Sequence, residues 1–429
     1  MNERLLQFIW QFQHFHKGEL ATTAGEPIQV IYQGQLNRNQ GPDFSGAKIR
    51  IGAALWAGTV ELHIHTSDWD KHRHQHDSNY TNVVLHVVWQ HDVMTGTAPV
   101  LELAPRVPAI LLQYYEELMH SAAFIPCAAG LHTVRDLTWK SWKESLLAGR
   151  LLRKAKLAET WLQQSHDHWE EVFWWLLARS FGMKVNADAF EAIARSLPVT
   201  LLARHKNRLP QLEALLFGQA GLLDQDFGED YPASLKKEYR FLQEKYALRP
   251  VHIPVLFLRM RPGNFPTVRL AQLAMLVHHS AHLFSRVLEA GTPGEVKNWF
   301  DQPASDYWDR HYRFGEEAPV KKKKPGKALA DHLIINTMAP VLFAYGNYHG
   351  RQLYKDKALR WLEETAAEHN AITDGFAHIN IENMTAYDSQ ALTELKNEYC
   401  DKRRCLDCAA GNFLLKAKSY PAGEPFADS

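Results

Sequence analysis

Residues 55–65, Leu-Trp-Ala-Gly-Thr-Val-Glu-Leu-His-Ile-His, decide the fold of the N-terminal part of this chain. Successive side chains of a β-strand point to opposite faces, so the second half of this segment has one apolar and one polar face. The polar face carries Glu61, His63 and His65, which are candidate metal ligands and proton carriers. The segment therefore predicts a strand that belongs both to a core and to a functional site.

The neighbouring segments are also β-rich. Residues 27–32 and 47–51 have strand-like patterns, and Gly-Ala-Ala at 52–54 predicts a hairpin into the strand described above. Residues 82–89 form a nearly continuous apolar run, which is typical of a central strand covered on both faces. Residues 100–103 predict one more strand.

Helical patterns flank and follow these strands. A three-and-four spacing of apolar residues predicts an amphipathic helix over 4–16, and the polar segment 67–80 predicts a short helix between strands. Beyond residue 108 the patterns are almost all helical, over 109–121, 137–165, 169–181, 187–196, 212–222, 234–246, 267–290, 329–344 and 356–368. We therefore predict an α+β protein with a small mixed β-sheet domain at 1–107 and a large all-α domain at 108–429.

The overall charge excludes some classes of protein. The 429 residues include 48 basic and 48 acidic side chains, so the formal net charge is zero with neutral histidine. A protein that coats nucleic acid or an anionic membrane needs a basic surplus, so any nucleic-acid contact must come from a local patch. The apolar runs are shorter than the ~20 residues of a membrane span and no secretory leader is evident, so we expect a cytoplasmic protein without a membrane partner.

A second carboxylate is expected beside Glu61. Asp43 lies in Gln40-Gly41-Pro42-Asp43-Phe44, just before the strand at 47–51, and a tight hairpin would bring it next to Glu61. Two carboxylates brought together away from water repel each other unless a cation neutralises them. The pair therefore predicts a site for a hard divalent cation, Mg²⁺ or Mn²⁺.

These residues resemble a known pattern. Pro42-Asp43 followed by Glu61-Leu62-His63, on an α-β-β-β-α-β order over residues 4–105, resembles the restriction-endonuclease-like core of the PD-(D/E)XK nuclease superfamily, with His63 where the pattern has lysine. The resemblance implies that Asp43 and Glu61 hold the metal and that His63 helps to position the water that attacks a phosphodiester. A neutral imidazole is a weaker electrostatic substitute for lysine, but it is able to act as a general base.

A second resemblance uses some of the same residues. His63-Ile64-His65 is similar to the opening His-x-His strand of amidohydrolases and of polymerase-and-histidinol-phosphatase phosphoesterases, which implies a metal-dependent hydrolase with His65 as a further metal ligand. Those families need a barrel of alternating strands and helices, whereas this chain continues with helices.

More histidines follow this strand. His72, His74 and His76 have a spacing that would point them apart on a helix, although His72 and His76 could face one ion from an extended loop; the alternative is a solvated turn. His86 is expected either as a core histidine or as a neighbour of Glu61.

Cysteines supply a second signal. Cys400-x4-Cys405-x2-Cys408 places three of the four cysteines within nine residues, and Cys127 is the fourth. Thiolates at these separations converge on one Zn²⁺ ion or on an iron–sulfur cluster, both of which usually take four ligands. The alternative is a set of reduced cysteines in the core. We expect a structural metal here.

A third candidate site is basic. Arg259, Arg261 and Arg269 surround a Pro-Gly turn and the start of a helix, and this combination suits a phosphate or a carboxylate. The alternative is that these arginines pair with acidic side chains between helices. We expect any contact with nucleic acid to use this patch.

The chain as a whole resembles an uncharacterised bacterial family of unknown function, through residues 39–44, 60–63, 67–69, 124–127 and 399–408. This resemblance implies no activity. The leading hypothesis is a metal-dependent nuclease or phosphodiesterase that acts on nucleic acid. The opposing hypothesis is a non-catalytic, metal-stapled scaffold or nucleic-acid-binding protein.

Overall fold

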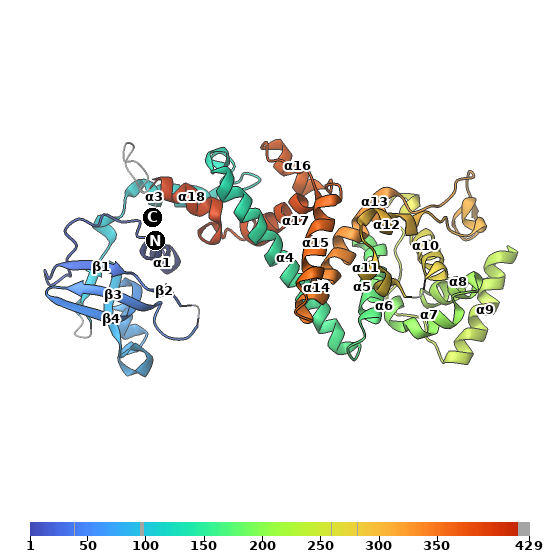
Figure 1. The fold of residues 1–429 in the computed structure, drawn as a ribbon, viewed down its shortest axis with the longest axis horizontal. Coiled ribbons are helices and arrows are strands. Elements are labelled where there is room, and N and C mark those ends of the chain that lie inside the picture. The colour runs from blue at the N-terminus through green and yellow to red at the C-terminus, as the bar shows by residue number, and fades with distance from the viewer. Residues whose placement is uncertain (38, 95–97, 259, 281, 419–429) are drawn as a thin grey trace. The chain divides into compact units, whose positions relative to one another are not determined.

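The computed structural model describes residues 1–37, 39–94, 98–258, 260–280 and 282–418 (Figure 1). Contacts divide the chain into two units. One unit joins Met1–Trp142 with the chain from Leu395 onward, and the other is Lys143–Glu394. The boundary predicted after residue 107 falls inside the first unit, because the C-terminal segment packs with the N-terminal part.

The first unit contains a mixed sheet, which confirms the predicted α+β class. Its strands run in the order β1-β3-β4-β5-β6, and β2 pairs with β3. β4 pairs antiparallel with β3 and parallel with β5. The bounds are β1 (Ile28–Tyr32), β2 (Gln35–Leu36), β3 (Phe44–Ile51), β4 (Ala54–His65), β5 (Val83–Gln90) and β6 (Val100–Glu102).

Alternating side chains explain why these segments form one sheet. Phe44, Ile49 and Val60 are fully buried on β3 and β4, where apolar residues alternate with polar ones. β5 is buried on both faces in its middle, as expected for a central strand between β4 and β6. Gly52 adopts a φ of 58° in the turn between β3 and β4, which suits glycine best.

Short helical segments cover the sheet. Helix α1 (Glu3–Gln11) begins at Asn2, whose side chain accepts a hydrogen bond from the Leu5 N–H. It ends before the predicted residue 16, because Gln13 adopts a left-handed conformation with φ of 52°. The connection from β4 to β5 contains α2 (Asp68–Lys71) and the 3₁₀ turns η1 (His74–His76) and η2 (Ser78–Tyr80).

Helices from both ends of the chain complete the first unit. η3 (Ala104–Arg106), α3 (Ala109–His120) and η4 (Leu131–Thr133) follow the sheet. The π-helical turn η9 (Leu395–Cys400), the 3₁₀ turn η10 (Cys405–Asp407) and α18 (Ala409–Lys418) return to it, and α18 packs against α3 and η4. Figure 1 shows α18 beside α3, so chain segments almost 300 residues apart share one core.

The second unit is almost entirely helical. α4 (Asp136–Gln164) begins in the first unit and continues in the second. The other helices of the second unit are α5 (Trp169–Phe181), α6 (Met183–Ser196), α7 (Val199–His205), α8 (Leu209–Gln219), α9 (Asp230–Tyr246), α10 (Pro266–His279), α11 (Leu283–Glu289), α12 (Pro293–Lys297), α13 (Lys327–Leu333), α14 (Ala339–Tyr348), α15 (Gln352–Glu364), α16 (Ala371–His378) and α17 (Ala386–Glu394). The unit also contains the 3₁₀ turns η5 (Pro262–Asn264), η6 (Asn298–Phe300) and η7 (Asp306–Asp309) and the π-helical turn η8 (Ile334–Met338). A small hairpin is formed by β7 (His311–Arg313) and β8 (Glu316–Glu317).

One helical prediction differs from this arrangement. The single helix predicted at 267–290 is two helices, because α10 ends at Ser280, which is extended with φ of −157°. The segment Lys327–Tyr348 is long and apolar enough to cross a membrane, with a mean hydropathy of 1.3, but 72% of it is buried inside the protein, which is typical of a core helix.

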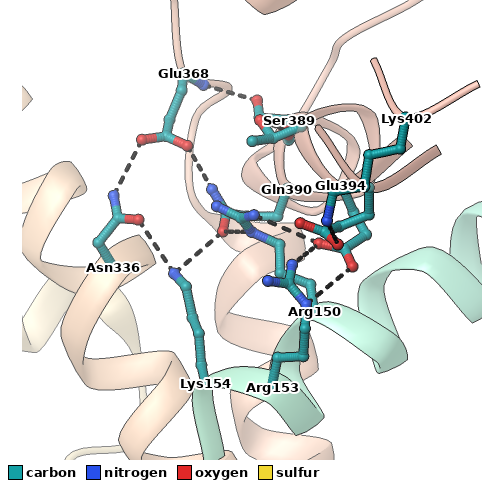
Figure 2. A network of polar contacts seen from close by, with 11 residues as sticks. Arg150, Arg153, Lys154, Asn336, Glu368, Ser389, Gln390, Glu394 and Lys402 are labelled. Atoms are coloured by element: carbon teal, nitrogen blue, oxygen red, sulfur yellow. Dashed lines mark hydrogen bonds and ion pairs between the residues drawn. The ribbon is translucent and has the colours of Figure 1, made fainter. Parts of the chain in front are cut away.

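A network of polar side chains links α4 to α17 within the second unit (Figure 2). The Arg150 guanidinium donates to Gln390 Oε1 at 2.7 Å, and Glu394 forms ion pairs with Arg150 and Arg153. The Glu394 side chain is 6% exposed. Buried charges remain stable only when they are paired, so Arg150 and Glu394 depend on each other.

Two amide side chains extend the network to a lysine. Lys154 donates to Asn336 Oδ1 at 3.2 Å and to Gln390 Oε1 at 3.4 Å. The same two amides donate to Glu368, at 3.1 Å from Asn336 and 2.6 Å from Gln390. Burial lowers the pKa of Lys154 to about 7.

Candidate metal centre

The β3–β4 pairing brings the two predicted carboxylates together. Phe44 lies opposite Val60, so Asp43 and Glu61 are adjacent across the two strands. The Asp43 backbone N–H donates to Glu61 Oε2 at 3.0 Å, and the Leu62 N–H donates to Asp43 Oδ2 at 3.0 Å. The predicted proximity of Asp43 and Glu61 is therefore present, and backbone donors fix both carboxylates.

Burial raises the pKa of both carboxyl groups of this pair. Glu61 is 6% exposed, and burial, reinforced by the Asp43 charge, raises the pKa of Glu61 to about 8. Burial likewise raises the pKa of Asp43 to about 6, although the Leu62 N–H and Gln7 oppose that shift. Gln7 on α1 donates to Asp43 Oδ1 at 2.8 Å. The two carboxyl groups therefore share a site in which negative charge is costly.

His63 lies beside these carboxyl groups. Its Nε2 atom is 3.5 Å from Glu61 Oε1, and its Nδ1 atom is 2.9 Å from His86 Nε2. Register explains both contacts, because Glu61 lies opposite His86 in the parallel pairing of β4 and β5. Burial, followed by the neighbouring histidines, lowers the pKa of His63 to about 3, and burial lowers that of His86 to about 4. Both imidazoles are therefore neutral at pH 7.

The connection after β4 adds two more imidazoles. His63 Nε2 is 3.1 Å from His72 Nδ1 and 3.3 Å from His74 Nε2, and the ligand atoms of these three histidines all lie within 4.8 Å of one another. Arg73 between them adopts a left-handed conformation with φ of 60°. This turn brings His72 and His74 to the same side, so the partner of His72 is His74 rather than His76.

Glu61 belongs to the same cluster. Its Oε1 atom lies 3.5 Å from His74 Nε2 as well as from His63 Nε2. Tyr80 stacks on the His74 ring with centroids 3.8 Å apart, and Trp69 meets the His63 ring edge-on. His63 is buried, His74 is half-buried and His72 is exposed, so the cluster opens to solvent at His72.

His65 lies apart from this cluster. It is half-buried at the end of β4, and its backbone N–H donates to Asp68 Oδ2 at 2.9 Å. Across the described residues, the histidine group with metal-ligand spacing is His63, His72 and His74, without His65. The sheet is also an open path of strands rather than a barrel, so the barrel implied by the His-x-His resemblance is wrong.

The predicted basic patch lies in the second unit. Arg261 is exposed just before η5. Arg269 is 7% exposed, and its guanidinium donates to Gln272 Oε1 at 2.9 Å and to Asn264 Oδ1 at 2.5 Å. Arg259 lies outside the described residues. Arg269 therefore points into the protein, where a nucleic-acid backbone does not reach it.

A hollow of about 300 Å³ lies next to Asp43 within the first unit. Gln7, which holds Asp43, lines it together with Arg4, Asn37 and Arg404. Arg4 and Arg404 both pair with Asp407 on the same wall. The hollow therefore combines a mostly polar face of α1 with two guanidinium groups.

Sequence reasoning missed parts of the site. No role was predicted for His74, because its position depends on the left-handed conformation of Arg73, which the sequence does not reveal. Gln7 carries no chemical motif, and its role depends on α1 packing against β4.

The comparisons with known proteins give one match. A family model described as "Protein of unknown function (DUF2851)" matches residues 3–371, so it includes the cluster and Cys127 but ends before Cys400. No curated protein and no solved structure matches the chain.

Proposed function

The chain belongs to DUF2851, a family of proteins of unknown function, and we propose that this member is a divalent-metal-dependent phosphodiesterase that acts on nucleic acid. One observation carries the proposal. Glu61 Oε1 lies 3.5 Å from the Nε2 atoms of both His63 and His74, inside a cluster that also holds Asp43 and His72.

The chemistry of the donor groups fits a metal ion. Glu61 and Asp43 offer carboxylate oxygens, while His63, His72 and His74 offer imidazole nitrogens. His63 binds through Nε2 only if its Nδ1–H donates to His86, which the 2.9 Å contact allows. A mixed oxygen and nitrogen set favours Mn²⁺ or Zn²⁺ over Mg²⁺, which prefers oxygen ligands.

The side chains of the chain divide the remaining work. A divalent ion held by these residues would polarise a phosphoryl oxygen and offset charge in the transition state. Asp43 and Glu61 orient that ion, since backbone N–H groups fix both carboxylates. His72, at the solvent-exposed edge, would complete the ligand set, while the buried His63 stays neutral and so keeps a lone pair for the ion.

The neighbouring hollow supports a phosphate-containing substrate. Arginine binds phosphate through paired N–H donors, and Arg4 and Arg404, which share the Asp407 carboxylate, line the hollow beside Gln7. Because the formal net charge of the chain is zero, attraction to nucleic acid depends on such local groups.

The test is a cleavage assay. Purified protein with Mn²⁺ is incubated with single- and double-stranded DNA and RNA. We expect cleavage by the wild type, and a loss of about 100-fold or more in rate for Glu61→Gln and Asp43→Asn. The matched control is Glu26→Gln, which makes the same chemical change at an exposed carboxylate before β1 and should cleave normally.

Two outcomes would contradict the proposal. Equal cleavage by wild type and Glu61→Gln would indicate a contaminating nuclease. Tight binding of Mn²⁺ without cleavage of any nucleic acid would favour a metal-stapled scaffold, in which the same cluster only stabilises the fold.

A further inference from the structure

The four cysteines of the chain gather in the first unit. Cys127 follows α3 in the loop before η4, whereas Cys400, Cys405 and Cys408 lie between η9 and α18. All four are buried free thiols. Helix α18, which starts after Cys408, packs against η10, which begins at Cys405, and against η4, which follows Cys127; η10 in turn packs against η9, which ends at Cys400, so the four cysteines lie in one region.

The local backbone directs three of these thiols inward. The π-helical turn η9 ends at Cys400, and Arg403 then adopts a left-handed conformation with φ of 51°, which turns the chain back. Cys408 immediately precedes α18, and the backbone N–H groups of Ala410 and Gly411 donate to its sulfur. Burial raises the pKa of the free Cys408 thiol, while these N–H groups would stabilise the thiolate of a bound metal.

The backbone approaches this site closely at Gly411. A Cβ atom on Gly411 would lie 2.2 Å from the backbone oxygen of Cys405, so only glycine lets α18 pack against the cysteine turn. Gly130, three residues after Cys127, packs against Leu414 on α18, where an added Cβ would lie 3.1 Å from the Leu414 side chain. Close packing at these two positions therefore explains the glycines of the Ala-Ala-Gly segments after Cys127 and Cys408.

The thiols are spaced more widely than those of a tetrahedral zinc site. Four sulfurs around one tetrahedral Zn²⁺ lie about 3.8 Å apart, given a Zn–S bond of ~2.3 Å. Among the described residues, which include all four cysteines, no three thiols lie within 4.8 Å of one another. In an iron–sulfur cluster the four cysteines are divided among two or four iron atoms, so sulfurs on different irons are farther apart.

An unused donor faces the same site. The indole N–H of Trp142 is buried without an oxygen or nitrogen acceptor in the described part of the chain. It lies close enough to Cys408 to favour the charged form of that thiol. N–H groups directed at thiolate or sulfide are a recurrent feature around iron–sulfur clusters, because they stabilise the negative charge on sulfur.

We propose that Cys127, Cys400, Cys405 and Cys408 bind a polynuclear iron–sulfur cluster that ties the C-terminal segment to the loop after α3. The cluster is structural. It fixes the turn that carries Arg404 and Asp407, which form one wall of the hollow beside Gln7. The polar interactions that hold this turn, such as the Arg4–Asp407 ion pair, are partly exposed and contribute little stability.

The test uses the full-length wild type purified without oxygen. We expect iron and acid-labile sulfide in equal amounts, at two or four atoms of each per chain, together with visible absorption that dithionite bleaches. One zinc ion per chain, or neither metal in protein expressed with added iron, would overturn the proposal. Nuclease activity does not enter these measurements, so the result is independent of the proposed function.

Two variants extend the test. Cys127→Ser should lose the cluster although it lies about 270 residues before the other cysteines, whereas Ser121→Ala in the same loop should keep it. Trp142→Phe keeps the aromatic ring but removes the N–H, so the cluster should stay while its reduction potential falls. Full cluster content in Cys127→Ser, or an unchanged potential in Trp142→Phe, would contradict the assigned ligand set or the donor role respectively.

Discussion

Glu61 is the residue on which the metal centre depends. Its carboxyl group contacts the Asp43 N–H and two imidazoles, and none of these groups carries a positive charge at pH 7. Among the residues that the structure describes, Gln7 and the Leu62 backbone N–H are the hydrogen-bond donors to the Asp43 carboxylate. Such a pair costs free energy as two anions and becomes favourable when a divalent cation is bound.

This imbalance predicts a pH dependence of stability. The pKa of Glu61 is about 8 in the folded protein, against 4.5 for an exposed glutamate, so the folded state holds the proton more tightly. Glu61 therefore contributes stability to the metal-free protein that is lost as pH rises from about 5 to 8, at up to about 1.4 kcal/mol per unit of pKa shift. The net fall should appear above about pH 6.5, where the histidines are neutral in the unfolded protein as well. Chemical unfolding in EDTA at several pH values measures this effect.

The opposite sign applies to the histidines at lower pH. His63 has a pKa of about 3 in the folded protein, so its protonation opposes folding and stability should rise from about pH 3 to 6.5. Glu61→Gln should flatten the fall above about pH 6.5 and leave the rise between about pH 3 and 5 largely unchanged. A fall of equal size in Glu61→Gln would show that another group is responsible.

At the scale of elements, the connection between β4 and β5 completes the site. Three short helical segments there carry His72 and His74, and the left-handed Arg73 sets their relative direction. Arg73→Pro cannot adopt a positive φ, so it should weaken Mn²⁺ binding strongly while the sheet still folds. Arg73→Gly should bind like the wild type, since glycine adopts this conformation readily.

Titration calorimetry with Mn²⁺ checks this prediction, and circular dichroism checks the fold of both variants. Equal affinities of Arg73→Pro and Arg73→Gly would mean that His72 and His74 are not both ligands.

The elements also show how far the sequence could predict this structure. Alternation predicted β3, β4 and β5 to within about three residues, and the Asp43–Glu61 contact followed from the hairpin. The role of His74 could not be predicted, because the left-handed Arg73 directs its side chain away from the side that the sequence spacing implies. Arg269 was expected at an open anion site, but its helix turns that face toward the protein interior. The sequence alone does not show whether such an arginine is exposed or buried, because this depends on tertiary contacts.

At the scale of the molecule, different interactions stabilise the two units. The first unit joins both ends of the chain around the sheet and the cysteine site. The second unit contains the network of Figure 2, in which Glu394 pairs with Arg150 and Arg153. Glu394→Gln should lower the stability of the second unit by about 3 kcal/mol, because it leaves a buried guanidinium without its counter-charge.

Scanning calorimetry measures this loss. The matched control is Glu364→Gln, which removes an exposed partner of Arg360 and should change stability by less than about 0.5 kcal/mol. Equal effects of the two changes would show that the network of Glu394 contributes no more than a surface ion pair.

The most direct test of the metal centre is the anomalous signal of Mn²⁺ in crystals grown with the ion. We predict one strong peak within coordination distance of the Glu61 carboxylate and of the Nε2 atoms of His63 and His74. The peak should disappear in Glu61→Gln and persist in His76→Ala, which changes an exposed histidine of the same connection. A peak elsewhere, or none at these ligands with Mn²⁺ in excess, would contradict the assignment.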